Sequence, residues 1–228
     1  MNTFSLLRGI RFLDSFFPSG GYAYSSGLEA AVQGGAVRNA EDLTGYVSDY
    51  LRGGLGSREA VAAGLARDAA SHGTFSIALD ADRELETMQL CRETRMASRQ
   101  MGRQVIRIAC DRDDAPSILR DFLAEVESGR SPGHLAVSLG LTLGAFGWNK
   151  QETVAASLYQ SAAGLVSAAL KLLPIGQREG QRLLESWLPL IEKLSREAES
   201  RTEMASWTPV QDIYAMKHSR LESRLFRS

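Results

Sequence analysis

Few of the side chains that usually do chemistry are spaced for it in this sequence. The three histidines, His72, His134 and His218, lie far apart, and none has a second His or Cys at helical spacing. The two cysteines, Cys91 and Cys110, form no CxxC pair and match no zinc, haem or iron–sulfur spacing. We therefore expect no resident metal and no cofactor, although a nickel site made of one His or Cys with carboxylates stays open.

Motifs for covalent or nucleotide chemistry are missing as well. The sequence has no GxSxG nucleophile elbow, and its Ser, His and Asp residues follow no ordered triad signature. A P-loop places Ser or Thr directly after its lysine, but the four lysines here precede Gln, Leu, Leu and His. The chain is therefore predicted not to be an enzyme.

Five arginines form the clearest charged pattern. They are spaced by three or four residues and so share one face of a predicted helix: Arg92, Arg95, Arg99, Arg103 and Arg107. Such a face is either solvated and paired with Glu93 and neighbouring acids, or a docking surface for an acidic or phosphate-bearing partner. Lys171 stands near the C-terminal end of an otherwise uncharged helix, where it either meets the helix dipole and reaches water or projects into a partner.

The densest local pattern is residues 16–29, here called the signature segment. Pro18 ends the preceding helix, and Gly20 and Gly21 allow backbone angles that other residues avoid. Ser25 or Ser26 is expected to cap the next helix, with Glu29 completing a capping box. The tyrosines of the segment are either packed into a corner or presented as an exposed patch, and an enzyme that uses this Tyr- and Gly-rich loop is a further alternative.

Four patches of the sequence resemble the UreF family of urease accessory proteins, in the order of that family. They are FPSGGYAYSSGLE (17–29), RETRMASRQMG (92–102), LKLLPIGQ (170–177) and DIYAMKHSRLESRLFRS (212–228). Together they span almost the whole chain. One departure is Tyr24, where many family members have His, so a metal-ligand role at that position is not expected.

The resemblance implies a urease maturation chaperone, all-helical and homodimeric. Such proteins bind the accessory protein UreD (also called UreH) and the GTPase UreG, assemble on apo-urease and support nickel insertion. They are thought to regulate GTP hydrolysis by UreG or to couple it to nickel transfer. An unrelated helical adaptor is the alternative.

The resemblance also implies roles for individual residues. In the signature segment, those expected to shape the dimer or the core of the complex are Pro18, Gly20, Gly21, Tyr22, Ser25, Gly27 and Glu29. Lys171 and Arg224 are expected to face the GTPase. In the C-terminal patch, residues 212–228, Arg220 is expected to bind a partner, and Leu225 and Phe226 are expected to dock on UreD.

Composition agrees with a soluble globular protein of the cytoplasm. The chain has 228 residues, 44% hydrophobic content and a net charge of −1, which gives no general attraction to nucleic acid or to a membrane. Its start lacks the basic head and apolar run of a signal peptide. Two uncharged stretches, 131–149 and 153–170, are interpreted as buried helices rather than membrane spans.

Apolar periodicity predicts an all-α fold, because no segment alternates with period two. We expect a single compact bundle-like domain of about ten helices over residues 1–200, with the two uncharged helices as a hairpin at its centre. Residues 201–228 are expected to be a linker and a mobile, partner-binding C-terminal tail. The predicted helices are 5–16, 26–33, 39–51, 57–71, one long helix from 74 or 80 to 110, 116–127, the two uncharged ones, 182–199 and 211–226.

Overall fold

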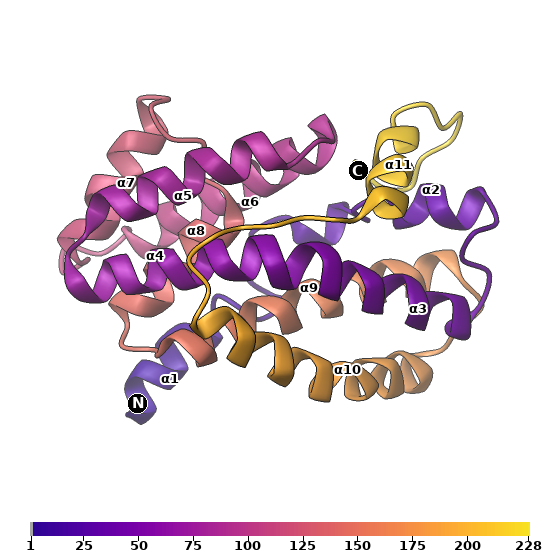
Figure 1. Cartoon of the computed structure of the whole chain (residues 1–228), viewed down its shortest axis with the longest axis horizontal. Helices are drawn as coiled ribbons and strands as arrows, with labels where there is room; N and C mark the ends of the chain where they lie inside the picture. The colour runs from indigo at the N-terminus through magenta and orange to yellow at the C-terminus, as the bar shows by residue number, and fades with distance from the viewer. Residues whose placement is uncertain (1) are drawn as a thin grey trace.

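The computed structural model describes residues 2–228, and these form helices and no strands (Figure 1). The all-α prediction is confirmed. In chain order the elements are α1 (Thr3–Ile10), η1 (Gly21–Ala23), α2 (Leu28–Gln33), α3 (Ala40–Tyr50), η2 (Leu51–Glu59), α4 (Ala60–His72), α5 (Phe75–Met88), α6 (Arg92–Ala109), α7 (Ser117–Glu127), α8 (Leu135–Ala145), α9 (Lys150–Leu172), α10 (Gln177–Glu199) and α11 (Pro209–His218).

Helix α8 lies at the centre of the fold. Every residue from 136 to 144 is buried, so this helix has no solvent face. Two glycines allow α4 to approach it: a Cβ at Gly140 would lie 2.3 Å from the Ala63 carbonyl oxygen, and one at Gly144 would lie 2.8 Å from that of Arg67. The prediction of a buried central position is therefore correct for α8, whereas α9 keeps an exposed face.

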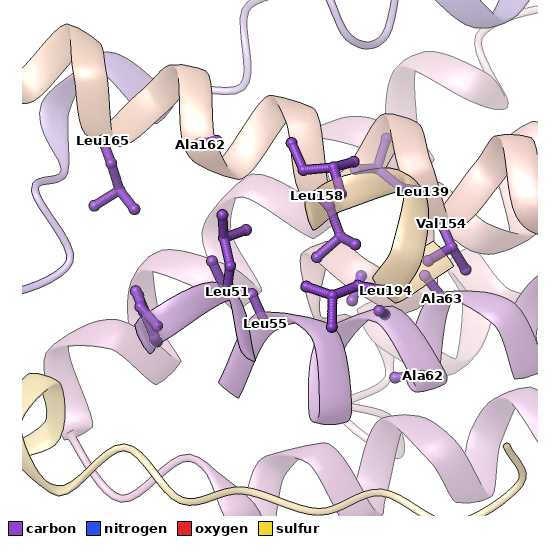
Figure 2. Packing of buried hydrophobic residues seen from close by; sticks show 14 of the residues in the cluster. Leu51, Leu55, Ala62, Ala63, Leu139, Val154, Leu158, Ala162, Leu165 and Leu194 are labelled. Carbon is purple, nitrogen blue, oxygen red and sulfur yellow. The ribbon is translucent and has the colours of Figure 1, made fainter. Parts of the chain in front are cut away.

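The apolar core is built where five elements meet. Figure 2 shows side chains of η2, α4, α8, α9 and α10 directed into one space. The labelled members are Leu51, Leu55, Ala62, Ala63, Leu139, Val154, Leu158, Ala162, Leu165 and Leu194, all of which are buried. Burial of a leucine or valine side chain contributes about 1.5–3 kcal/mol, so these residues stabilise the fold.

The predicted break between residues 51 and 57, where Gly53, Gly54 and Gly56 lie, is absent from the structure. The chain continues through η2, a π-helical segment, directly into α4. The linker after α10 crosses η2, where Trp207 N–H donates to the Gly53 carbonyl (2.7 Å) and Ala205 N–H to that of Ser57 (3.0 Å). A Cβ at Gly53 would lie 2.4 Å from the Trp207 carbonyl oxygen. Glycine is therefore required there by the close approach of the linker.

The long helix predicted to end near residue 110 is two helices, α5 and α6. The chain turns between them at Gln89, whose backbone is extended (ψ 100°). The Gln89 carbonyl accepts a hydrogen bond from Arg95 Nη1 at 2.7 Å, and the Cys91 carbonyl accepts from Thr94 Oγ1 at 2.9 Å. These contacts replace the helical ladder, and no Gly or Pro marks the break in the sequence.

Several helix ends also differ from prediction. Helix α1 stops at Ile10, α10 begins at Gln177 and runs through Pro189, and α11 ends at His218. Among the described helices, α9 alone is long and apolar enough to cross a membrane on length and composition. Half of its apolar window is buried in the fold, as in the core helix of a soluble protein, so this finding is weak support for a span.

Candidate functional site: the tail seated on the signature segment

The two ends of the sequence meet in space. The linker carries α11 to the side of α2 (Figure 1), and the last residues then run beside the signature segment. Arg227 N–H donates to the Ala23 carbonyl at 2.8 Å. The Ser25 hydroxyl donates to the Ser228 carbonyl oxygen at 2.6 Å, and the Ser25 N–H donates to the same atom. Patches separated by about two hundred residues in the sequence therefore form one site.

Glu29 is the buried centre of this site. Its carboxylate accepts from Leu225 N–H (2.6 Å), Phe226 N–H (3.1 Å) and His218 Nε2 (2.8 Å). The predicted capping box is wrong, because Ser25 Oγ accepts from Glu29 N–H but the carboxylate turns to the tail instead. Burial acts to raise the Glu29 pKa, but the hydrogen bonds from Leu225, His218 and Phe226 outweigh it and hold the pKa below its ordinary value.

His218 links the tail to two helices. The ring is fully buried, with Nε2 facing Glu29 of α2 and Nδ1 3.0 Å from Glu93 Oε2 of α6. Both carboxylates are acceptors, so the arrangement is satisfied in full when both ring nitrogens carry protons. Arg224 Nη1 adds a 3.5 Å contact to the second Glu93 oxygen. Glu93 thus pairs with the tail rather than with the arginine stripe.

In this structure these contacts seat the tail on the body of the protein. Phe226 is only 5% exposed, and its ring lies under Lys171, with Nζ 5.2 Å from the ring centroid. This cation–π contact was not predicted, although both residues were singled out. Phe226 is therefore not presented as a docking anchor in this conformation, whereas its neighbour Leu225 is 62% exposed.

Two glycines of the segment have backbone angles that favour glycine. Gly20 has φ 79° and Gly27 has φ 84°, both in the left-handed region. A Cβ at Gly27 would also lie 2.6 Å from the backbone nitrogen of Ala215 in α11. Gly27 therefore sets how closely α11, and with it the tail, approaches α2. Gly21 forms the first turn of η1.

Other predicted residues face solvent. Tyr22 is 75% exposed, and Pro18, four residues earlier, is also exposed. The tyrosines of the segment therefore divide: Tyr22 belongs to an open patch, whereas Tyr24 donates to Gln100 Oε1 of α6 at 2.8 Å. Arg220 is exposed after the end of α11. The exposed rim of the site thus combines Tyr22, Leu225 and the partly exposed Arg224.

Much of the arginine stripe is paired within the fold. Arg95 and Arg99 both lie near Glu86 Oε1 of α5, at 3.8 and 3.3 Å, and Arg107 lies 3.3 Å from Glu127 of α7. The pairing acids therefore come from neighbouring helices. For these three arginines, the structure therefore favours a solvated, ion-paired face over a docking surface.

Two features of the site region were not predicted. A cavity of about 660 Å³ is lined by the signature segment, α6, α9 and the η2 region. Beside it, the fully buried Asp82 accepts from Ser131 Oγ, Gly133 N–H and His134 N–H at 2.6, 2.7 and 2.8 Å. The His134 ring lies between Ser98 Oγ and Glu86, and its pKa is lowered mainly by burial. Neither arrangement has a sequence motif.

No group of three or more His, Cys, Asp or Glu that could hold a metal ion is found in residues 2–228. This agrees with the geometry at His218, whose two nitrogens face carboxylates on opposite sides of the ring. Cys91 is buried, and burial raises the pKa of the Cys110 thiol to about 11, which leaves it unreactive at neutral pH.

Comparison with known proteins assigns the family. The UreF family model matches residues 37–188, which is more than half of the chain. The chain belongs to the UreF family. It is 30% identical to the urease accessory protein UreF of Bacillus sp. (strain TB-90) over 225 residues, covering 98% of this chain and 99% of that protein. It is 33% identical to UreF of Methylorubrum populi and 31% identical to UreF of Cereibacter sphaeroides (strain ATCC 17025), each over at least 97% of both chains.

The chain is thus a urease accessory protein by family, similar to these relatives along nearly its full length. The predicted resemblance is confirmed. The family model begins after the signature segment, but the relatives' alignments include almost all of the chain, and so reach both the segment and the tail.

Proposed function

We propose that the chain is a urease maturation chaperone that supports nickel insertion into apo-urease and acts by binding partners rather than by catalysis. Family membership carries the proposal. The joined tail and signature segment support it, because Tyr22, Leu225 and Arg224 of these two segments are all exposed. Aromatic and arginine side chains are enriched at protein-binding surfaces.

The rim is proposed to serve the accessory protein UreD and the GTPase UreG. Leu225 is the apolar contact for UreD, and Arg224 and Lys171 face UreG. Lys171 remains exposed although its ammonium lies over the Phe226 ring. Because no lysine in the chain fits a P-loop, its part in the GTPase cycle is regulation of UreG rather than hydrolysis.

The homodimer is proposed to form through the exposed face of α9. Tyr159 is 44% exposed on this helix, and the exposed Gly164 and Ser167 follow along it. Between Glu152 and Lys171 the helix carries no charged side chain. An uncharged face with small residues lets a second helix approach closely. The protein is proposed to act in the cytoplasm, without binding nucleic acid or membrane.

The functional test is complementation of a urease-positive bacterium from which the gene for this chain has been removed. We expect the intact chain to restore urease activity and the nickel content of purified urease. Leu225→Ala, which changes the rim, should reduce the restored activity at least about tenfold if the residue is a binding hot spot. Leu188→Ala, which changes an exposed leucine on α10, is the matched control and should restore activity in full.

Two outcomes would contradict the proposal. Urease that acquires its full nickel content without the chain would show that maturation does not need it. Equal restoration by Leu225→Ala and by the intact chain would show that Leu225 of the rim is not needed for urease maturation. In the first case the chain would be a helical adaptor of another pathway.

A further inference from the structure

The His218 ring lies between two carboxylates of like charge. Glu29 Oε2 of α2 is 2.8 Å from its Nε2, and Glu93 Oε2 of α6 is 3.0 Å from its Nδ1. Both distances are in the range of N–H···O hydrogen bonds. An ionised carboxylate accepts hydrogen bonds and donates none, so each contact is a hydrogen bond only when the ring nitrogen that makes it carries a proton.

A neutral ring cannot satisfy both carboxylates. It has one N–H, so whichever nitrogen keeps the proton, the other directs its lone pair at a carboxylate oxygen 3.0 Å away or less. The ring has no exposed surface, so bulk water does not reach it to supply the missing donor. Leaving a buried charged acceptor without its donor costs more free energy than leaving a neutral one. The seated tail therefore selects the doubly protonated ring.

The charges around the ring also favour its positive form. Helices α2 and α6 both pack against α11, and they contribute Glu29 and Glu93. Among the described residues, one further ion pair joins this group, from Arg224 of the tail to the second Glu93 oxygen at 3.5 Å. On α11 itself, Lys217 Nζ lies over the Tyr214 ring instead. The charges of the two carboxylates, Arg224 and the ring cancel when the ring is protonated, whereas a neutral ring leaves one negative charge uncompensated.

We propose that His218 is a pH-sensitive latch, which holds the C-terminal tail on the body of the protein only while both ring nitrogens carry protons. The stabilisation is present at low pH and is lost as pH rises and the ring gives up its second proton. This direction is opposite to that of Glu29, whose own contribution is lost as pH falls. The tail is thus seated in a window of pH bounded by these two groups.

Release of the tail would also move the exposed Leu225 and Arg224 away from the signature segment. The proposed partner surface would then exist only below the pH at which the latch opens. This consequence rests on the proposed function, whereas the latch is a property of the chain alone. It is therefore tested without any partner protein, so that failure of the latch and failure of the proposed function give different results.

The test is hydrogen exchange of backbone amides 219–228 in the isolated full-length chain, expressed as protection factors that remove the intrinsic pH dependence of exchange. We expect protection to fall at least about tenfold between about pH 6 and about pH 9, because a hydrogen bond to a charged group is lost. Glu93→Gln should abolish this fall, since the glutamine amide can donate to a neutral ring at Nδ1 while Nε2 keeps its proton for Glu29.

His72→Gln is the matched control, because it changes an exposed histidine at the end of α4, and it should keep the full pH dependence. Amides of the central helix α8 should stay protected at both pH values, which shows that the fold as a whole is retained. His218→Gln gives a second measurement, should Glu93→Gln fail to seat the tail. Its side chain does not titrate, so its tail protection, whatever its size, should be equal at both pH values.

A long-range ¹H–¹⁵N spectrum of the histidine rings measures the protonation directly. With the tail seated, we expect both nitrogens of His218 to be protonated at about pH 6. A neutral His218 ring under these conditions would overturn the proposal, as would equal tail protection of the unchanged chain at both pH values. A fall in protection that persists in His218→Gln, or in Glu93→Gln with its tail seated, would overturn it as well.

Discussion

Replacing Glu29 with alanine is expected to release the C-terminal tail from the body of the protein. The change removes the acceptor for Leu225 N–H, Phe226 N–H and His218 Nε2 and leaves the fully buried His218 ring with one carboxylate partner. Breaking a buried charge pair by removing one partner costs about 3–5 kcal/mol. Hydrogen exchange of backbone amides 219–228 should then rise to the rate of an unstructured peptide.

Glu222→Ala is the matched control, because this exposed tail residue makes no contact with Glu29. Its amide protection should equal that of the unchanged chain. The contact also has a pH dependence. The folded pKa of Glu29 lies below its ordinary value of 4.5, so the stabilisation is complete above that pH and is lost as pH falls through the folded pKa. Unchanged protection of residues 219–228 in Glu29→Ala would show that the tail is seated by other contacts.

Replacing Asp82 with alanine is expected to give the largest loss of stability. The carboxylate is fully buried and accepts hydrogen bonds from Ser131, Gly133 and His134, directly before the central helix α8. Its negative charge also lies at the positive end of that helix. The three donors would be left buried without a partner, which predicts a loss of about 3–5 kcal/mol in the free energy of unfolding.

Urea denaturation followed by circular dichroism measures this loss. Asp80→Ala on the same helix is the control, since Asp80 is exposed and makes only a surface pair with Arg83 at 3.5 Å. That change should alter the free energy of unfolding by less than about 1 kcal/mol. A similarly small change for Asp82→Ala would mean that the α8 start is held by packing alone.

Features that depend on local sequence were predicted well. The helix predicted to begin at residue 39 begins there as α3, with Asn39 as its cap: Asn39 Oδ1 accepts from Asp42 N–H at 2.9 Å. Apolar periodicity identified the helices, and the lack of charge identified α8 as buried. These signals act within one or two turns of chain, so residue type and spacing are sufficient to find them.

Features created by contacts far apart in sequence were not predicted. The glycines of η2 were predicted to break the helix, because the linker that packs on Gly53 begins about one hundred and fifty residues later and leaves no local signal. The α5–α6 turn has no Gly or Pro, so only tertiary contacts mark it. Glu29 has the spacing of a capping box, but its carboxylate accepts hydrogen bonds from the tail amides instead.

The candidate site shows the same division. The family patches identified the residues at both ends of the chain, and the structure brings Ser25, Gly27 and Glu29 into contact with the tail. No sequence pattern indicates that Phe226 lies beneath Lys171. The cavity could not be predicted either, because its walls come from segments throughout the chain.

Co-purification with UreD and UreG tests the central claim most directly. The intact chain is compared with one truncated after Trp207, which removes α11 and the tail, and circular dichroism confirms that the truncated chain remains helical. We expect the intact chain to form a complex containing all three proteins and the truncated chain to lose UreD. If the intact chain binds neither protein, or the folded truncated chain binds both as well as the intact one does, the proposed role of the tail-bearing surface in urease maturation is wrong.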